Sequence, residues 1–231
     1  MRFLLTNDDG YGAPGLETLE RAAAALGSIS VIAPDDHLSG CSHQIVDKRS
    51  IAVTHKGEGR FTLDAFPADC VRLANQGLVA EFDWVLSGVN NGGNLGVDLY
   101  LSGTVAAIRE AAILGHPAIG FSQYRRNRHV EADWSWTQRQ VSRILPVLLE
   151  KGLEPGYFWN VNFPHPEADI DPQLVFCDPD PQPLQLAYVS NGETYTYSGS
   201  YQKRPQTPGH DVEVCFGGAI AISLVSVFRA S

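Results

Sequence analysis

Two adjacent carboxylates near the start of the chain are the residues best placed to do chemistry. Asp8 and Asp9 stand between a short apolar run and a turn that contains Gly10 and Gly12. Neighbouring side chains of a strand point to opposite faces, so both carboxylates reach one site only if the backbone turns there, which glycine permits. Burying two like charges raises their pKa or requires a cation. A divalent metal would satisfy the pair, although these residue types are equally common in a solvated turn.

The apolar pattern around this pair predicts the elements that position it. We expect a buried strand at residues 3–5, a helix at residues 14–26 that Gly27 ends, and a second strand at residues 29–33. Such a βαβ unit implies parallel strands joined by a right-handed crossover. Because parallel sheets bind ligands beyond the carboxyl ends of their strands, residues 35–43 should share one rim with the carboxylates.

A glycine-rich loop predicts a second part of the same rim. Glycine is frequent between a predicted strand at residues 82–87 and a predicted helix at residues 102–114. Close backbone approach and the free N–H groups at a helix start suit a phosphate. A flexible connection with Ser102 as the helix cap explains one hydroxyl. It does not explain Asn90, Asn94 and the glycines together.

All side chains expected on this rim offer hard oxygen donors. They are Asp8, Asp9, Ser39, Asn90 and Asn94, with Ser102, Gly103 and Thr104 nearby. Such donors favour Mg²⁺ or Mn²⁺, with Ca²⁺ as an alternative, over zinc or copper. A metal so placed could polarise a phosphoryl group and activate water for attack on phosphorus, while helix amides stabilise the developing charge. The sequence has no P-loop, Rossmann dinucleotide or serine-hydrolase motif.

The rest of the chain predicts more core elements and then a C-terminal arm. We expect a hairpin beside the core at residues 44–66, a helix at 67–77, a strand at 116–122, a solvated basic loop at 123–133, a helix at 134–151 that Pro146 disturbs, a strand ending at 159–164, and a last strand at 219–228. An alternating Tyr- and Thr-rich segment at 188–201 predicts a protruding hairpin suited to self-association, because isolated hairpins need a partner surface. The predicted fold is therefore α/β, with a catalytic core at residues 1–164 and a C-terminal part at residues 165–231.

Composition and charge limit the classes of function. The 231 residues are 44% hydrophobic and 19% charged, which is typical of a globular protein. A net charge of −9 argues against general affinity for nucleic acid or an anionic membrane. The four cysteines are widely spaced and no signal-peptide pattern opens the chain, so we expect reduced thiols and a cytoplasmic location.

Several motifs occur in a fixed order along the chain. They are Thr6-Asn7-Asp8-Asp9-Gly10, Ala33-Pro34-Asp35 with Ser39-Gly40, Pro67-Ala68-Asp69-Cys70-Val71, Ser87-Gly88-Val89-Asn90 through Asn94-Leu95-Gly96, Ser102-Gly103-Thr104-Val105, and Asn160-Val161-Asn162-Phe163-Pro164. Together they resemble the SurE family of survival-protein nucleotidases, which are metal-dependent phosphatases of nucleoside monophosphates. The resemblance implies a Rossmann-like three-layer core with a mostly parallel sheet, and a C-terminal hairpin arm exchanged in homodimers or tetramers.

The resemblance also assigns roles to residues of the rim. It implies that Asp8, Asp9, Ser39 and Asn90 bind one divalent cation per subunit. Asn94, Ser102, Gly103 and Thr104 would line the phosphate pocket, and we place Gly40 there as well. The expected catalytic residues are Asp8, Asp9, Asn94, Ser102 and Thr104, acting on nucleoside 5′-monophosphates, with 3′-monophosphates as a further candidate substrate. Which carboxylate serves as base, or whether one attacks phosphorus directly, stays open.

Three residues depart from the family pattern. Gly93 stands where a Pro is usual, Gln44 where a Ser is common, and Ala111 where a Gly is usual. These departures motivate an alternative function, a nucleotide-binding or stress-interaction module of the same fold with weak catalysis. A haloacid-dehalogenase-type phosphatase is disfavoured because it would need Asp-x-Asp. His43 is a further candidate, as proton donor to the leaving oxygen.

Overall fold

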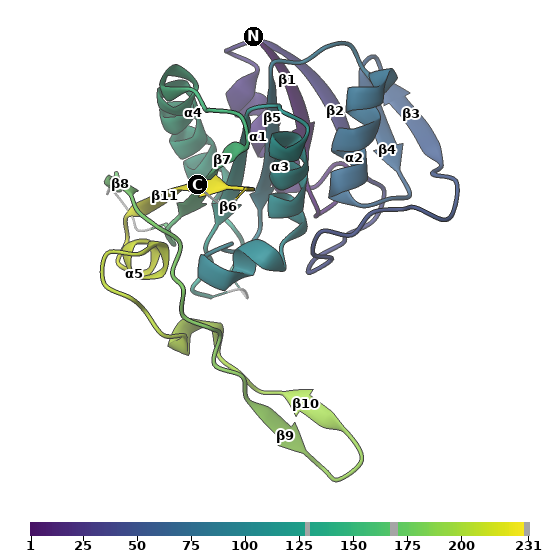
Figure 1. Ribbon diagram of the computed structural model, residues 1–231. Helices are drawn as coiled ribbons and strands as arrows, with labels where there is room; N and C mark the ends of the chain where they lie inside the picture. Colours follow the sequence, from purple (N-terminus) through teal and green to yellow (C-terminus); the bar gives the residue numbers. More distant parts are fainter. Residues whose placement is uncertain (128–129, 167–170, 229–231) are drawn as a thin grey trace.

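A nine-stranded sheet forms the centre of the protein in the computed structural model, which describes residues 1–231 apart from 128–129, 167–170 and 229–231 (Figure 1). In spatial order the strands are β3 (Val53–Gly57), β4 (Arg60–Leu63), β2 (Ser28–Pro34), β1 (Arg2–Thr6), β5 (Trp84–Asn90), β6 (Ala118–Gln123), β7 (Tyr157–Phe163), β11 (Ile220–Ser226) and β8 (Leu174–Phe176). All strands from β4 to β7 are parallel to their neighbours, whereas β3 and β11 pair antiparallel with β4 and β7. The predicted α/β class with a mostly parallel sheet is confirmed.

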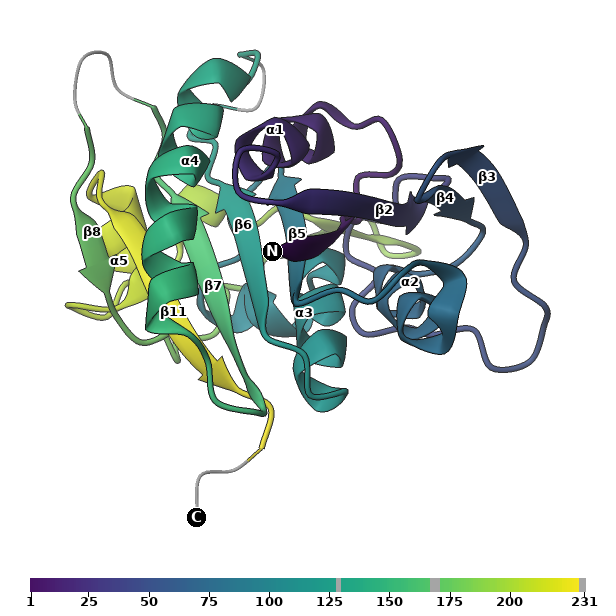
Figure 2. The same cartoon turned by 90° about the horizontal axis from the view of Figure 1, so that it is seen from above.

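Helices cover both faces of this sheet. Helices α1 (Pro14–Ala23) and α4 (Trp134–Lys151) pack on one face, and α2 (Pro67–Leu73) and α3 (Gly103–Ile113) pack on the other (Figure 2). Phe3 and Leu5 join the core under α1 and α4, while Leu4 joins the core under α2 and α3. This alternation is what a strand requires when both of its faces are buried.

The sheet changes its direction of growth between β1 and β5. Strand β1 pairs in parallel with β2 on one side and with β5 on the other. The helices that follow β1 and precede β6, α1 and α3, lie on opposite faces. The loops after β1 and β5 therefore open beside each other at the carboxyl ends of the strands, which is where doubly wound sheets bind ligands.

The predicted hairpin at residues 44–66 is formed by β3 and β4, and it lies at the side of the core as part of the main sheet. Strand β4 pairs in parallel with β2, with Thr62 opposite Ala33, so the hairpin extends the main sheet at one edge. The physical reason is burial: Leu63 packs with Leu4 and Ile32 in the core under α2.

Several predicted boundaries also moved. Helix α1 ends at Ala23, so Gly27 does not end it. Gly27 instead lies against the start of the chain, where a Cβ would come within 2.0 Å of the Met1 carbonyl oxygen. Strand β5 continues to Asn90 because Val89 is buried in the core. Helix α2 ends early and is followed by a π-helical turn, η1 (Ala74–Leu78), while α4 is one continuous helix through Pro146.

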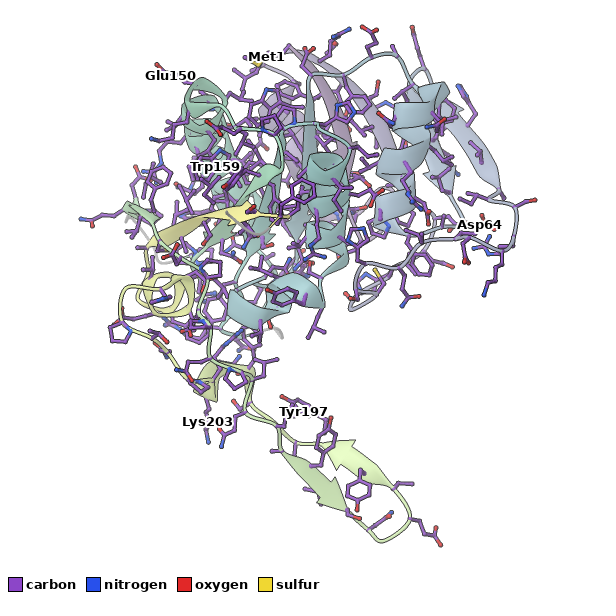
Figure 3. The ribbon with its side chains drawn as sticks, viewed as in Figure 1. Met1, Asp64, Glu150, Trp159, Tyr197 and Lys203 are labelled. Carbon is purple, nitrogen blue, oxygen red and sulfur yellow. The ribbon has the colours of Figure 1, made fainter. Side chains whose placement is uncertain are left out.

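The C-terminal part both completes the sheet and leaves the body of the protein. Strands β8 and β11 and helix α5 (Asp211–Phe216) pack at one edge of the sheet. Strands β9 (Tyr188–Ser190) and β10 (Tyr195–Tyr197) form an antiparallel hairpin that projects far from the core, with Tyr197 near its base (Figures 1 and 3). A 3-10 turn, η3 (Tyr201–Lys203), leads from the hairpin back to the body. The predicted C-terminal hairpin is thus confirmed.

Two further features concern the whole chain. In the part that the structure describes, no helix is both long enough and apolar enough to cross a membrane. All four cysteines are free thiols.

Candidate metal and phosphate site

Asp8 lies buried at the end of β1, against the first turn of α3. Its carboxylate accepts a hydrogen bond from the Thr104 hydroxyl. A Cβ at Gly103 would lie 2.7 Å from the Asp8 Cβ, so only glycine lets the helix start this close to the carboxylate. Ser102 is the N-cap of α3, and its Oγ accepts a hydrogen bond of 3.1 Å from the Val105 N–H. The structure therefore brings the predicted Ser-Gly-Thr motif directly to Asp8.

The environment of the carboxylate pair disfavours negative charge. Burial raises the pKa of Asp8 from 3.8 to about 6, an effect that the Thr104 hydrogen bond opposes and the charge of Asp9 increases. Burial also raises the pKa of Asp9, against the effects of the Asn91 N–H and of His37. The Asn91 N–H donates to Asp9 Oδ2 at 3.2 Å, and His37 Nδ1 lies 3.3 Å from Asp9 Oδ1. Two desolvated carboxylates of this kind gain from a nearby cation.

Ser39 lies on the loop after β2, and Asn90 is the last residue of β5, next to the loop that contacts Asp9. The Leu38 N–H donates to the Asp8 carbonyl oxygen at 2.7 Å, which holds the loop with Ser39 against the end of β1. Asn90 immediately precedes the residue whose N–H binds Asp9. Its Nδ2 donates to the Gly92 carbonyl oxygen at 2.8 Å, so Oδ1 is the atom that Asn90 can offer to a cation. That these oxygens share one coordination sphere stays a prediction.

The remaining residues predicted for the phosphate pocket have different surroundings. Gly40 is exposed in a turn where its φ is +72°. Asn94 is buried, and its Nδ2 donates to Ser122 Oγ at 2.8 Å. The Asn162 side chain accepts from the Asn94 N–H at 2.7 Å and donates to its carbonyl oxygen at 3.0 Å, and Asn160 Nδ2 donates to the same oxygen at 2.9 Å. Asn94 is therefore fixed from β6 and β7. The sequence showed that β7 ends in polar residues, but it did not show that they bind the backbone of Asn94.

His43 is engaged away from the role that the sequence suggested for it. Its Nε2 lies 2.9 Å from Glu110 Oε2, and its Nδ1 lies 3.3 Å from an Arg109 nitrogen. Arg72 Nε donates to the other oxygen of Glu110 at 2.9 Å. With both ring nitrogens occupied on α3, His43 anchors its loop to that helix, and nothing here supports it as the proton donor to a leaving group.

Arg125 corrects a second expectation. The loop at residues 123–133 was predicted to be solvated, but Arg125 is buried and donates to Asn91 Oδ1 at 2.5 Å. It thereby holds the residue whose N–H binds Asp9. Arg126 is exposed as predicted, and Arg128 and His129 lie outside the described residues. Nothing local in the sequence marked one arginine of this loop as buried.

The donor set can be compared with the metal it would hold. Among the described residues, no three His, Cys, Asp or Glu side chains gather as a cluster that could bind a metal ion. The nearest thiol, Cys41, lies beside Asp8, and burial raises its pKa to about 11, so it stays protonated and is a poor ligand. Two carboxylates with neutral hydroxyl and amide oxygens remain. This set fits a hard divalent cation such as Mg²⁺ or Mn²⁺.

These observations define a class of protein: a Rossmann-like α/β fold whose switch point carries a buried carboxylate, Asp8, beside the partly buried Asp9 and the amide end of a helix. The chain belongs to the SurE family, because residues 3–178 match the family described as survival protein SurE.

Similar proteins agree with this membership. The chain is 45% identical over 229 residues to a Synechocystis protein named putative 5′-nucleotidase, covering 98% of this chain and all of that one. It is 33% identical to the 5′-nucleotidase SurE of Paramagnetospirillum magneticum, covering 96% of this chain and 88% of the relative. The crystal structure of the SurE protein from Aquifex aeolicus superposes with a TM-score of 0.88 at 27% identity, covering 100% and 95% of the two chains.

Proposed function

We propose that this protein is a divalent-metal-dependent phosphatase that hydrolyses nucleoside 5′-monophosphates, and also 3′-monophosphates, to nucleoside and phosphate. The observation that carries the proposal is the position of Asp8, buried between Asp9 and the amide end of α3. Family membership and the names of the relatives support a 5′-nucleotidase. Asp8, Asp9, Ser39 and Asn90 would hold the Mg²⁺ or Mn²⁺ ion.

The residues of the chain divide the work between charge and position. When bound, a divalent cation supplies positive charge that polarises the phosphoryl group and acidifies water. The N–H groups at the start of α3, with Gly103 and Thr104, are placed to bind phosphoryl oxygens, since a helix start favours anions. Thr104 orients the Asp8 carboxylate through Oδ1. A bound cation would favour the ionised form of both carboxylates, so either Asp8 or Asp9 could accept a proton from the attacking water.

The alternative of a weakly catalytic binding module rested on three departures from the family pattern. Gln44 is exposed, and Ala111 is buried in the core under α2 and α3. A Cβ at Gly93 would meet Tyr201 and Leu95. None of these contacts involves Asp8 or Asp9, so the departures leave the carboxylate pair unchanged.

The projecting hairpin supports the proposal that residues 165–231 mediate self-association. Tyr188, Val189 and Tyr195 on the hairpin are 57%, 64% and 75% exposed. A two-stranded hairpin is at best marginally stable alone in water, and exposed aromatic side chains favour a partner surface. We propose that this partner is a second copy of the chain, in a homodimer or tetramer.

The direct test measures phosphate release from AMP, GMP and 3′-AMP with Mg²⁺, Mn²⁺, Ca²⁺ or a chelator. Asp8→Asn and Asp9→Asn are each expected to lower kcat by at least about 100-fold. The matched control is Asp36→Asn, an exposed carboxylate on the neighbouring loop, which should retain activity. Turnover that survives chelation or either Asn substitution would refute the proposal. Tight nucleotide binding without hydrolysis under every metal would favour the binding module.

A further inference from the structure

A buried ion pair connects the C-terminal part to the glycine-rich loop after β5. Arg204 donates to Asp98 Oδ2 at 2.6 Å and to the Leu95 carbonyl oxygen at 3.1 Å. The Arg204 side chain is only 2% exposed. Tyr201 adds a hydrogen bond of 2.7 Å to the same Asp98 oxygen and one of 3.3 Å to the Gly93 carbonyl oxygen. Both Tyr201 and Arg204 directly follow the projecting hairpin.

The segment that precedes the hairpin approaches the same loop from another direction. The Gly96 N–H donates to Asp211 Oδ2 at 2.8 Å, and the Asp180 N–H donates to Asp211 Oδ1 at 2.8 Å. Gly96 has a φ of +52°, and a Cβ there would lie 2.6 Å from the Asp180 carbonyl oxygen and 3.2 Å from Arg204. The loop is thus enclosed by both ends of the arm, in a space that accepts only glycine.

Asp98 transmits this anchorage to the phosphate pocket. It lies in the 3-10 turn η2 (Gly96–Tyr100), and its carboxylate accepts from the Leu95 N–H at 3.2 Å. Its carbonyl oxygen accepts from the N–H groups of Leu101 and Ser102, each at 3.0 Å. Ser102 is the N-cap of α3. One residue therefore joins Arg204 to the cap of the helix that faces Asp8.

Stability alone is a weak explanation for this arrangement. Replacing a buried ion pair by apolar side chains is often neutral or stabilising, because removing two charges from water is costly. A buried pair is better suited to selecting one conformation of the chain around it. The loop needs such selection because its glycines leave the backbone with much conformational freedom.

We propose that Arg204 is a positioning residue for the phosphate pocket, acting through Asp98 on the loop at residues 93–101 and on the start of α3. This inference rests on the proposed phosphatase function for its kinetic part. The substrate phosphate then loses affinity when the pair is broken, in the ground state and transition state alike, so KM rises more than kcat falls. The affinity for inorganic phosphate, measured as its inhibition constant as a product inhibitor, falls in parallel.

The test compares three variants with a matched control. Arg204→Met combined with Asp98→Asn removes both charges and avoids leaving one buried and unpaired. Tyr201→Phe removes only the contacts of the hydroxyl with Asp98 and the Gly93 carbonyl oxygen. Arg204→Lys keeps the positive charge but loses the second nitrogen of the guanidinium group, which donates to the Leu95 carbonyl oxygen. The control is Arg60→Met on β4, which breaks the part-buried ion pair of Arg60 with Glu20 on α1.

Amide hydrogen exchange and kinetics are measured on each purified full-length protein. In the double variant we expect faster exchange at residues 93–102 only, with KM for AMP and the inhibition constant of phosphate raised about tenfold and kcat within about threefold. Arg204→Lys should restore part of the loss, and Arg60→Met should change neither quantity. Unchanged exchange in this loop, or a fall confined to kcat, would overturn the inference. Because exchange does not depend on turnover, an inactive wild-type protein would refute the proposed function while exchange still decides whether Arg204 positions the loop.

Discussion

Replacing Asp8 by Asn is expected to stabilise the metal-free protein while removing its activity. Burial raises the pKa of Asp8 from 3.8 to about 6 in the folded state. The folded state therefore binds the proton more tightly than the unfolded state, so the free energy of unfolding falls as pH rises between these two values. A rise of about two pH units, at about 1.4 kcal/mol each, means that the ionised carboxylate costs about 3 kcal/mol above the folded pKa. Asn has the same shape and no charge, and its oxygen can still accept the Thr104 hydrogen bond.

Urea unfolding in the presence of a chelator measures this cost. At about pH 7 the Asp8→Asn protein should be more stable than wild type by up to about 3 kcal/mol, and the two should converge below about pH 3, where Asp8 is protonated in both the folded and the unfolded state. Asp36→Asn, which changes an exposed carboxylate of the same rim, should have little effect at either pH. Added Mg²⁺ should stabilise wild type and leave Asp8→Asn unchanged, since a ligand stabilises only the protein that binds it. An Asp8→Asn protein less stable than wild type at neutral pH in chelator would refute the reasoning.

Three further predictions test other contacts. Gly103→Ala places a methyl group 2.7 Å from the Asp8 Cβ. The resulting overpacking, of about 1 to 3 kcal/mol, should displace the carboxylate and lower kcat/KM by about 10- to 100-fold. Unchanged kinetics would contradict this close approach. Replacing residues 186–198 by a short Gly-Ser turn should reduce the assembly state in sedimentation velocity at a fixed protein concentration, and an unchanged assembly would exclude the hairpin as the contact. The His43 and Arg72 contacts lower the pKa of Glu110, so they stabilise the fold at neutral pH, and this stability is lost as pH falls through the folded pKa. In urea unfolding, Glu110→Gln should cost roughly 1 to 3 kcal/mol at neutral pH and progressively less in acid. A difference that does not change with pH would contradict this.

Local patterns in the sequence were sufficient for the parts of the fold that local interactions determine. The apolar run before Asp8, the helix start at Ser102 and the alternation of the hairpin were all recognisable, because strand burial, helix capping and pleating act over a few residues. The convergence of the loops on one rim also followed, since parallel strands end on the same side of a sheet. The pairing of the 44–66 hairpin with the main sheet did not follow, because the contact of β4 with β2 depends on burial of Leu63 in a core formed by distant residues.

The same limit applied to the contacts that hold the site. Arg125 reaches Asn91 across 34 residues, and Arg204 reaches Asp98 across 106 residues. Neither arginine stands in a motif, and each resembles an ordinary surface charge when its sequence neighbours are read alone. A side chain that acts by holding another segment is visible only when that segment has been placed.

A glycine-rich loop that binds a ligand through its backbone creates a need for such distant contacts. Glycine allows the close approach that Gly96 and Gly103 show, but it also raises the conformational entropy lost on ordering, by roughly 0.5 to 1 kcal/mol per residue relative to alanine. The loop after β5 contains Gly92, Gly93 and Gly96, which have no side chains of their own to offset that cost. Its hydrogen bonds to Asn162, Arg204 and Asp211 come from elements that follow it in the chain. If this loop forms the proposed phosphate pocket, the order of the pocket depends on the C-terminal part being folded against it, and variants of Tyr201, Arg204 or Asp211 should affect the pocket before they affect the carboxylate pair.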